Sequence, residues 1–268
     1  MVKYISIDEA ISLVKDGDHI TAGMAASEGK EFFLNLHKIA DSINHVTVDN
    51  CLPMSPYEFI VNDKYKSKFT INSWFFSGDL RKAFHNKNIS FIPNHLHFAG
   101  LRRKDHIKTN IYVGNCTMPD KHGFVSLSLS NVYEKETIEK ADIVVLEVNP
   151  NFPRTFGDLE VHSDEVDYFV KTDYMPQILA DTVPNEKDIK IGSIIADMIQ
   201  DRDTIQLGIG GIPNAVANAL VNKKDLGVHT EMLTTGFMKL FKNGAVTNKY
   251  KSLHKGKMVA AFALGTED

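Results

Sequence analysis

The sequence predicts an α/β protein with two repeated open α/β domains and mainly parallel sheets, the second domain being incomplete. Three observations support this prediction: an internal repeat, short apolar runs that alternate with helical patterns, and a glycine-rich turn at the end of one apolar run. We expect the first domain at residues 1–180 and the second at residues 185–268. Pro176 and Pro184 mark the linker between them.

The repeat relates residues 10–23 to residues 195–208 at one fixed offset. Each copy has paired apolar residues at helical spacing, two aspartates, a short apolar run and a glycine. Both therefore predict a helix, an aspartate-rich turn, a strand and a glycine turn. The first copy continues through strands near 89–93, 109–113 and 142–148. The second copy stops at residue 268, so we expect it to lack most of its second half.

A glycine-rich turn opens the next helix of the second copy. Ile205–Ile209 is a short, β-branched apolar run typical of a buried strand. The glycines after it permit positive φ and a close backbone approach. The following helix begins with free N–H groups, which favour negative charge. The alternative is a tight turn whose glycines only serve packing. The spacing matches neither a Rossmann fingerprint nor a P-loop. Six residues form this turn: Gly208, Gly210, Gly211, Ile212, Pro213 (first helical turn) and Asn214 (near the cap).

A second feature is a carboxylate on the next strand. Leu226–Met232 is the predicted strand, and Thr234-Thr235-Gly236 forms a turn before a helix. Glu231 therefore lies near the strand end, in the crevice where open α/β sheets bind ligands. The alternative is a surface carboxylate, and the neighbouring glycine turn argues against it. Glu28 follows the first copy's glycine turn and is interpreted as an acid at a helix start, with substrate contact as the alternative.

Two blocks of sequence resemble a known family. Residues 208–216 (Gly-Ile-Gly-Gly-Ile-Pro-Asn-Ala-Val) and 224–232 (Lys-Asp-Leu-Gly-Val-His-Thr-Glu-Met) resemble the 4-hydroxybutyrate and butyrate:acetate CoA-transferases, a group that includes acetyl-CoA hydrolase/transferases. Residues 119–123, 141–158 and 166–170 carry the same resemblance. The likeness covers most of the chain and is strongest from about residue 111 to 248. It also implies further CoA-binding segments beyond residue 268.

The resemblance implies roles for the two features. The matching glutamate, Glu231, is the nucleophile, which forms an acyl-glutamyl anhydride and then a glutamyl-CoA thioester. The glycine turn shapes the CoA and oxyanion site. One difference concerns the residues around the nucleophile, because relatives carry Ser-Asp-Gly where this chain has Thr234-Thr235-Gly236.

The expected function is therefore transfer of CoA between a short-chain acyl-CoA and a free carboxylate such as acetate. Two alternatives stay open: acyl-CoA hydrolysis, and a non-catalytic CoA-binding or assembly role. Coenzyme A is a substrate here, and the chemistry requires neither a metal nor a permanently bound cofactor. A homodimer is expected only by analogy.

Composition excludes several other classes. The formal net charge of −4 gives no basic surface for nucleic acid. Cys51 and Cys116 provide no disulfide framework, which favours reduced thiols in the cytoplasm. No apolar run approaches the length of a membrane span, so we expect no membrane partner.

Overall fold

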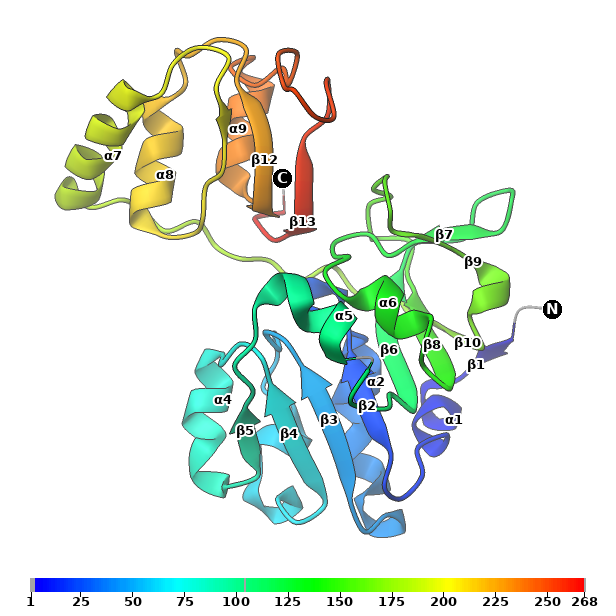
Figure 1. Ribbon diagram of the computed structural model, residues 1–268. Coiled ribbons are helices and arrows are strands. Elements are labelled where there is room, and N and C mark those ends of the chain that lie inside the picture. The colour runs from blue at the N-terminus through cyan, green and yellow to red at the C-terminus, as the bar shows by residue number, and fades with distance from the viewer. Residues whose placement is uncertain (1–2, 104, 268) are drawn as a thin grey trace. The chain divides into compact units, whose positions relative to one another are not determined.

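The computed structural model describes residues 3–103 and 105–267. The chain divides after Pro176 into two compact units (Figure 1). Residues 177–180, which the sequence places in the first domain, pack within the second unit. The reason is a backbone contact, since the N–H of Leu179 donates to the carbonyl of Gly265 at 2.7 Å.

The first unit contains an eight-stranded sheet in which every neighbouring pair is parallel. This sheet confirms the predicted mainly parallel α/β class. In spatial order the strands are β1 (Tyr4–Ile5), β10 (Tyr168–Lys171), β8 (Ile143–Val148), β6 (Ile111–Cys116), β2 (His19–Ala22), β3 (Val46–Asn50), β4 (Phe69–Ser73) and β5 (Ile89–Phe91). A separate antiparallel pair joins β7 (Phe124–Ser126) to β9 (Glu160–His162).

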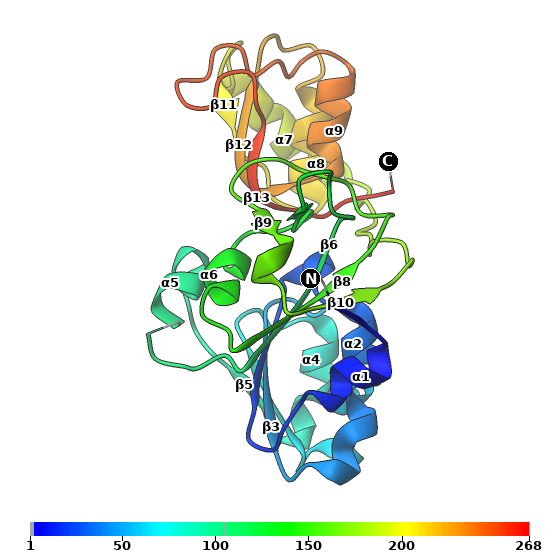
Figure 2. The ribbon, with the colours of Figure 1, turned by 90° about the vertical axis from the view of Figure 1, so that its right-hand side faces the viewer.

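Helices cover both faces of this sheet (Figures 1 and 2). Along β6, Ile111 and Val113 enter one apolar core and Tyr112 enters the other, because successive side chains of a strand point to opposite faces. The first core lies under α1 (Ile7–Ser12), α2 (Lys30–Asn35), α3 (Glu58–Val61) and α4 (Gly78–Ala83). On the other face lie α5 (Ala99–Arg103) and α6 (Glu134–Ile138).

The second unit has a parallel three-stranded sheet of β11 (Thr204–Ile205), β12 (Gly227–Leu233) and β13 (Val259–Ala263). Its helices are α7 (Glu186–Met198), α8 (Gly211–Ala219) and α9 (Thr235–Lys242). All three helices contribute to one apolar core on one side of the sheet (Figure 2). Along β12, Val228, Thr230 and Met232 are buried, whereas His229 and Glu231 are exposed. Glu231 therefore lies on the face away from the helices.

The internal repeat is visible in equivalent hydrogen bonds. In the first unit the N–H of Lys15 donates to the Asp18 carboxylate at 2.7 Å. At the matching place in the second unit the N–H of Gln200 donates to Asp203 at 2.8 Å. Each aspartate therefore closes the turn between a helix and a strand, which explains why both copies carry it.

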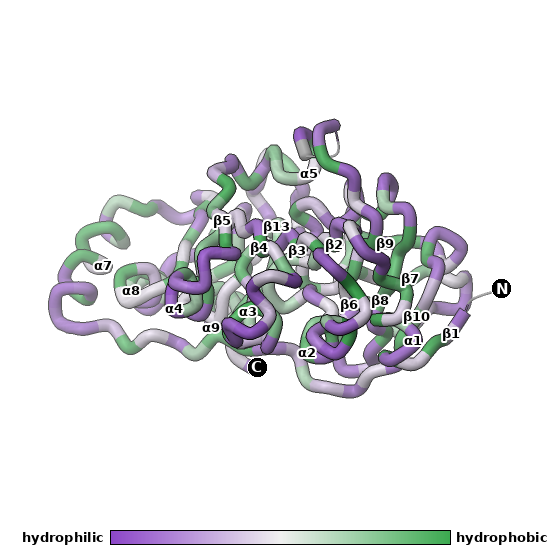
Figure 3. The backbone as a smooth tube through the Cα atoms, turned by 90° about the horizontal axis from the view of Figure 1, so that it is seen from below, coloured by the Kyte–Doolittle hydropathy of each residue, from purple (hydrophilic) through white to green (hydrophobic). Residues whose placement is uncertain are grey.

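Helix α7 packs through its small residues. A Cβ on Gly192 would lie 2.7 Å from the Cβ of Ala215, so only glycine permits this approach of α7 to α8. The larger Ile194 and Met198 are 58% and 75% exposed, and much of α7 is hydrophobic in Figure 3. Within residues 3–103 and 105–267, no helix combines the length and apolarity needed to cross a bilayer.

The core of the second unit can be tested on one helix. We expect Phe237→Ala to lower the free energy of unfolding by about 3–5 kcal/mol, because the ring is fully buried. Phe241→Ala on the same helix is the control. It should change stability by less than about 0.5 kcal/mol, since that ring is 54% exposed. Denaturant unfolding followed by circular dichroism measures both, and equal losses would contradict this assignment of the core.

Candidate active site

The strand before the glycine turn is shorter than the sequence predicts. Residues 205–209 were expected to be a strand, but β11 ends at Ile205. Beyond it the chain bends toward α8 and leaves the ladder. The Thr230 hydroxyl of β12 shares its proton between the Met232 carbonyl at 3.2 Å and the Leu207 carbonyl at 3.4 Å, so a side chain contacts the bend where a backbone pair would otherwise continue.

The three glycines of the turn have different roles. Gly210 alone has positive φ, at 113°, and it is the N-cap of α8. Gly208 and Gly211 do not use the positive φ that glycine permits. Gly211 packs against α7, because a Cβ there would lie 2.1 Å from the Asp188 carboxylate and would displace that side chain. At Gly208 neither reason applies, since a Cβ would meet nothing within 4 Å.

The N-terminus of α8 presents backbone donors without a side-chain cap. Gly211 and Ile212 are its first two residues, and the N–H groups of a first turn have no acceptor within the helix. Pro213, in the first turn as expected, contributes no N–H. Two amides and the positive end of the helix dipole therefore favour negative charge at this point.

The first repeat shows a carboxylate at the corresponding helix. Helix α2 follows β2 as α8 follows β11, and its N-cap, Gly29, has no side chain to cap it. The buried Glu147 of β8 takes that place: its carboxylate accepts from the N–H of Phe32 at 2.7 Å and of Glu31 at 3.2 Å. In this fold the helix after the glycine turn thus binds a buried carboxylate through two backbone amides in one repeat, whereas in the other its N-cap makes no side-chain hydrogen bond.

Glu231 lies beside the bend. Leu207 lies beside Thr230, the residue before Glu231, because the Thr230 hydroxyl contacts the Leu207 carbonyl. This contact joins the two segments. The Glu231 side chain is exposed, which leaves its carboxylate accessible to a reactant.

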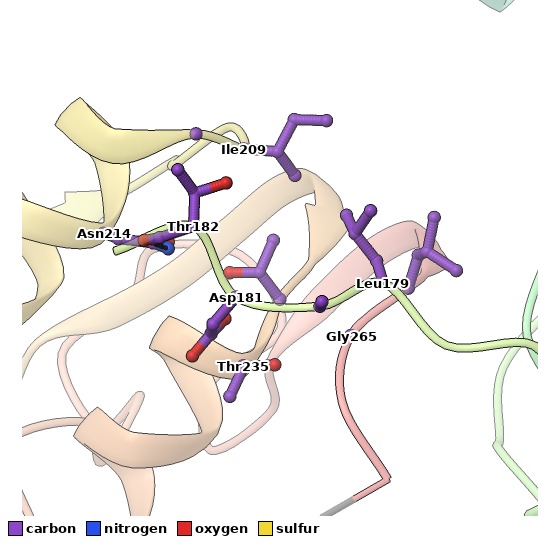
Figure 4. A pocket seen from close by; sticks show the side chains of 11 residues that line it. Leu179, Asp181, Thr182, Ile209, Asn214, Thr235 and Gly265 are labelled. Atoms are coloured by element: carbon purple, nitrogen blue, oxygen red, sulfur yellow. Dashed lines mark hydrogen bonds between the residues drawn. The ribbon is translucent and has the colours of Figure 1, made fainter. Parts of the chain in front are cut away.

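A hollow of about 270 Å³ lies at the carboxyl ends of β12 and β13 (Figure 4). Its lining residues are the segment 179–182, Ile209, Gly210, Asn214, Thr234, Thr235, Leu264 and Gly265. Glu231 is not among them. The N-termini of α8 and α9 both reach this hollow, because Gly210 and Thr234 are their N-caps.

The segment 179–182, which we call the strap, crosses this edge of the sheet. Asn214 lies near the N-cap Gly210, as expected, and its side chain contacts the strap. It is the fourth residue of α8, and its side-chain amide donates to the Thr182 carbonyl at 2.8 Å. A second anchor joins Asp181 to Lys239 at 2.7 Å. The Leu179–Gly265 bond completes the attachment, so Asn214 holds the strap.

Two buried carboxyls of the first unit were not predicted as site residues. Glu28 was expected at a helix start, but its side chain is buried and accepts from the N–H of Met54 at 3.1 Å. Burial raises the pKa of Glu28 to about 8 and that of Glu147 to about 7. For Glu147 the sequence held a signal, because it is a single charge inside the apolar run Ile143–Val148.

Comparison with known proteins places the chain in a family. Residues 1–181 match the acetyl-CoA hydrolase/transferase N-terminal domain. A succinyl-CoA:cyclohexane-1-carboxylate CoA transferase of Geobacter metallireducens is 36% identical over 98% of this chain and 60% of its own length. The 4-hydroxybutyrate coenzyme A transferase of Clostridium kluyveri is 32% identical over 99% of this chain and 62% of its own.

Solved structures support the same family assignment. RipA from Yersinia pestis superposes with a TM-score of 0.93 at 27% identity, covering 98% of this chain and 64% of RipA. A 4-hydroxybutyrate CoA-transferase from Porphyromonas gingivalis gives 0.80 at 28% identity, over 98% and 63%. The chain belongs to the acetyl-CoA hydrolase/transferase family. It spans about 60% of the length of the curated relatives described above.

The buried carboxyls predict a pH dependence. The folded protein keeps a proton on Glu28 up to pH about 8, whereas an ordinary glutamate releases it near 4.5. The free energy of unfolding should therefore fall as pH rises from about 4.5 to about 8 and then level off. Glu28→Gln should flatten this slope and Glu139→Gln, at an exposed site, should not. Denaturant titrations between pH 5 and 9 measure it, and unchanged slopes in Glu28→Gln would refute the assignment.

The strap contacts predict a local effect of Asn214. We expect Asn214→Ala to speed hydrogen exchange at the Leu179 amide by about fivefold, the loss expected for one hydrogen bond. Asn222→Ala is the control, because this exposed side chain lies beyond the C-terminal end of α8. Exchange followed by mass spectrometry gives the rates. The same rate in Asn214→Ala and in the unmodified chain would show that the strap does not depend on this contact.

Proposed function

We propose that this protein transfers CoA between a short-chain acyl-CoA and a free carboxylate such as acetate, with Glu231 as the nucleophile. The observation that carries the proposal is the position of Glu231, which is exposed on β12 and directly follows Thr230, whose hydroxyl contacts the Leu207 carbonyl just before Gly208. Membership of a family whose relatives are named CoA transferases supports the reaction class.

The reaction proceeds by acyl exchange on one side chain. The Glu231 carboxylate attacks the thioester carbonyl, the C–S bond breaks, and CoA leaves as a thiolate. The thiolate then attacks the glutamyl carbonyl of the anhydride, which releases the first acid as a carboxylate. The acceptor carboxylate attacks the glutamyl thioester and the same two steps run in reverse order, so that the new acyl-CoA forms and Glu231 is restored. Splitting the exchange in this way lowers each barrier.

Developing negative charge needs donors close to the reacting carbonyl. The N–H groups of Gly211 and Ile212 serve this purpose in the proposal, and one such donor contributes about 3 kcal/mol to the transition state. The first repeat supports the assignment, because the equivalent helix α2 binds the Glu147 carboxylate through two backbone amides. Gly208 and Gly210 shape the approach for CoA, while Asn214 positions the strap.

Hydrolysis is the second candidate, for a specific reason. Glu231 is exposed, so water can reach an intermediate on this side chain unless bound substrate excludes it. Water attack on the anhydride or on the thioester releases a free acid or CoA and restores the carboxylate. The family description covers both hydrolases and transferases.

Chemical trapping at Glu231 tests the proposal. The chain is incubated with acetyl-CoA, quenched with hydroxylamine, digested and analysed by mass spectrometry. We expect a glutamyl hydroxamate at Glu231, because both intermediates are activated acyl groups. Glu231→Gln should abolish it, whereas Glu186→Gln, an exposed glutamate of the same unit, should leave it unchanged.

The acceptor then separates the candidate reactions. Exchange of label from free acetate into acyl-CoA supports transfer, and release of CoA without added acetate supports hydrolysis. Binding of CoA with no hydroxamate at any glutamate would overturn the assignment of Glu231 and favour a binding role. The trapping experiment is decisive when it is repeated on a natural protein that has the full length of the relatives. The reason is that this chain spans about 60% of that length.

A further inference from the structure

Helix α7 has two different apolar faces. Its small residues pack inward, because Gly192 lies against Ala215 of α8 and Ala196 enters the core of the second unit. Four large apolar side chains lie on another face, at the i, i+3, i+4 and i+7 spacing that forms one stripe along a helix. They are Ile191 (40% exposed), Ile194 (58%), Ile195 (36%) and Met198 (75%), and we call them the α7 stripe. Contiguous exposed apolar patches are typical of interaction sites.

The first repeat shows that packing inside a unit does not require the whole stripe. At the fixed offset of the repeat, Ile191 and Ile194 correspond to Ser6 and Glu9 of the first unit. Both of these residues are exposed, and together they form the capping box of α1. The other two stripe residues correspond to apolar residues, the buried Ala10 and the half-buried Leu13. The outer part of the stripe therefore has no counterpart in the packing of the first unit, which favours a contact between molecules.

Two charges beside the stripe complement the same charges of a second copy. Lys190 and Asp197 directly precede Ile191 and Met198, so they lie about two turns apart on the same flank of α7. Both charged side chains are exposed. When two copies of a helix pair antiparallel about a two-fold axis, the same flank of each copy meets, and residues near one end meet residues near the other. Lys190 of one copy then comes level with Asp197 of the other, and the symmetry repeats this pair.

The apolar residues fit the same arrangement. An axis near Ile194 brings Ile194 and Ile195 of both copies together at the centre, and it places Ile191 opposite Met198. A parallel arrangement would place each charge level with its own copy, so it would gain no pair of opposite charges. Charge complementarity thus identifies the partner of the stripe as a second copy of this chain in the antiparallel direction.

We propose that the α7 stripe is an interface at which two copies of this chain pair through antiparallel α7 helices. Sedimentation of the whole chain over a range of concentrations tests the inference. We expect a reversible equilibrium between monomer and dimer, because an interface centred on one helix is small.

A substitution at the centre of the stripe should weaken the dimer. We expect Ile194→Glu to weaken dimerisation by about tenfold or more, since it would bury a charge beside the two-fold axis. Ile189→Glu is the matched control, because it makes the same change on the same helix but outside the stripe. Ile189 is 57% exposed and Ile194 is 58% exposed, so the two substitutions start from equal exposure. The control should leave dimerisation unchanged.

Charge reversal tests the direction of the pairing. Lys190→Glu should weaken dimerisation about threefold to tenfold, because it places carboxylates level with each other at both symmetric positions. The double variant Lys190→Glu/Asp197→Lys restores opposite charges in exchanged positions, so it should recover the affinity of the unmodified chain. Association through the apolar residues alone would show neither the loss nor the recovery.

Three results would contradict the inference. A chain that stays monomeric at the highest concentration reached would overturn it and leave the stripe to a different polypeptide. Dimers that Ile194→Glu does not weaken would show that another surface joins the copies. A double variant that pairs no better than Lys190→Glu would overturn the antiparallel arrangement. Glu231→Gln should leave the dimer unchanged, so this inference and the proposed function can fail separately.

Discussion

Parallel pairing of β11 with β12 is the constraint on which the proposed chemistry depends. Because parallel strands end at the same edge, the bend after β11 and the end of β12, which carries Glu231, lie at one edge of the sheet. The Thr230–Leu207 hydrogen bond keeps the bend at that edge after the ladder has stopped. Without this register, a nucleophile and helix amides would be unrelated features of the chain.

The two repeats use the same element differently. In the first, a buried glutamate of a neighbouring strand, Glu147, fills the N-terminus of α2 and also accepts from the Tyr174 hydroxyl at 2.8 Å. In the second, the N-cap of α8 is Gly210, which makes no side-chain hydrogen bond. A helix end that is internally satisfied contributes to stability, whereas one left open is available to a ligand. The two repeats thus contain one helix N-terminus with a structural role, in α2, and one that is a candidate binding site, in α8.

Buried polar groups in the first unit are costly for stability. Glu28 lies in a loop fixed by Asn115, with the Tyr57 hydroxyl beside it. Replacing such groups with apolar ones of similar shape is often neutral or stabilising.

Local pattern alone predicted much of the second unit. The expected strand at 226–232 is β12 at Gly227–Leu233, and the helix after Thr234 is α9. Apolar periodicity and glycine turns are local properties, so they are readable in the chain. The repeat was equally visible, because its aspartates close equivalent turns.

Tertiary packing determined the features that the local sequence pattern did not predict. Asn214 contacts Thr182, 32 residues away, and Glu28 contacts Met54, 26 residues away. No short-range pattern records such pairs. Packing of the bend against α7 and β12 explains three features: the early end of β11, the positive φ of Gly210 alone among the glycines of the turn, and the strap. The sequence by itself thus determined the elements and the identity of the candidate nucleophile. Only the tertiary structure decided which polar groups are buried, partnered or open, because burial depends on contacts between distant segments.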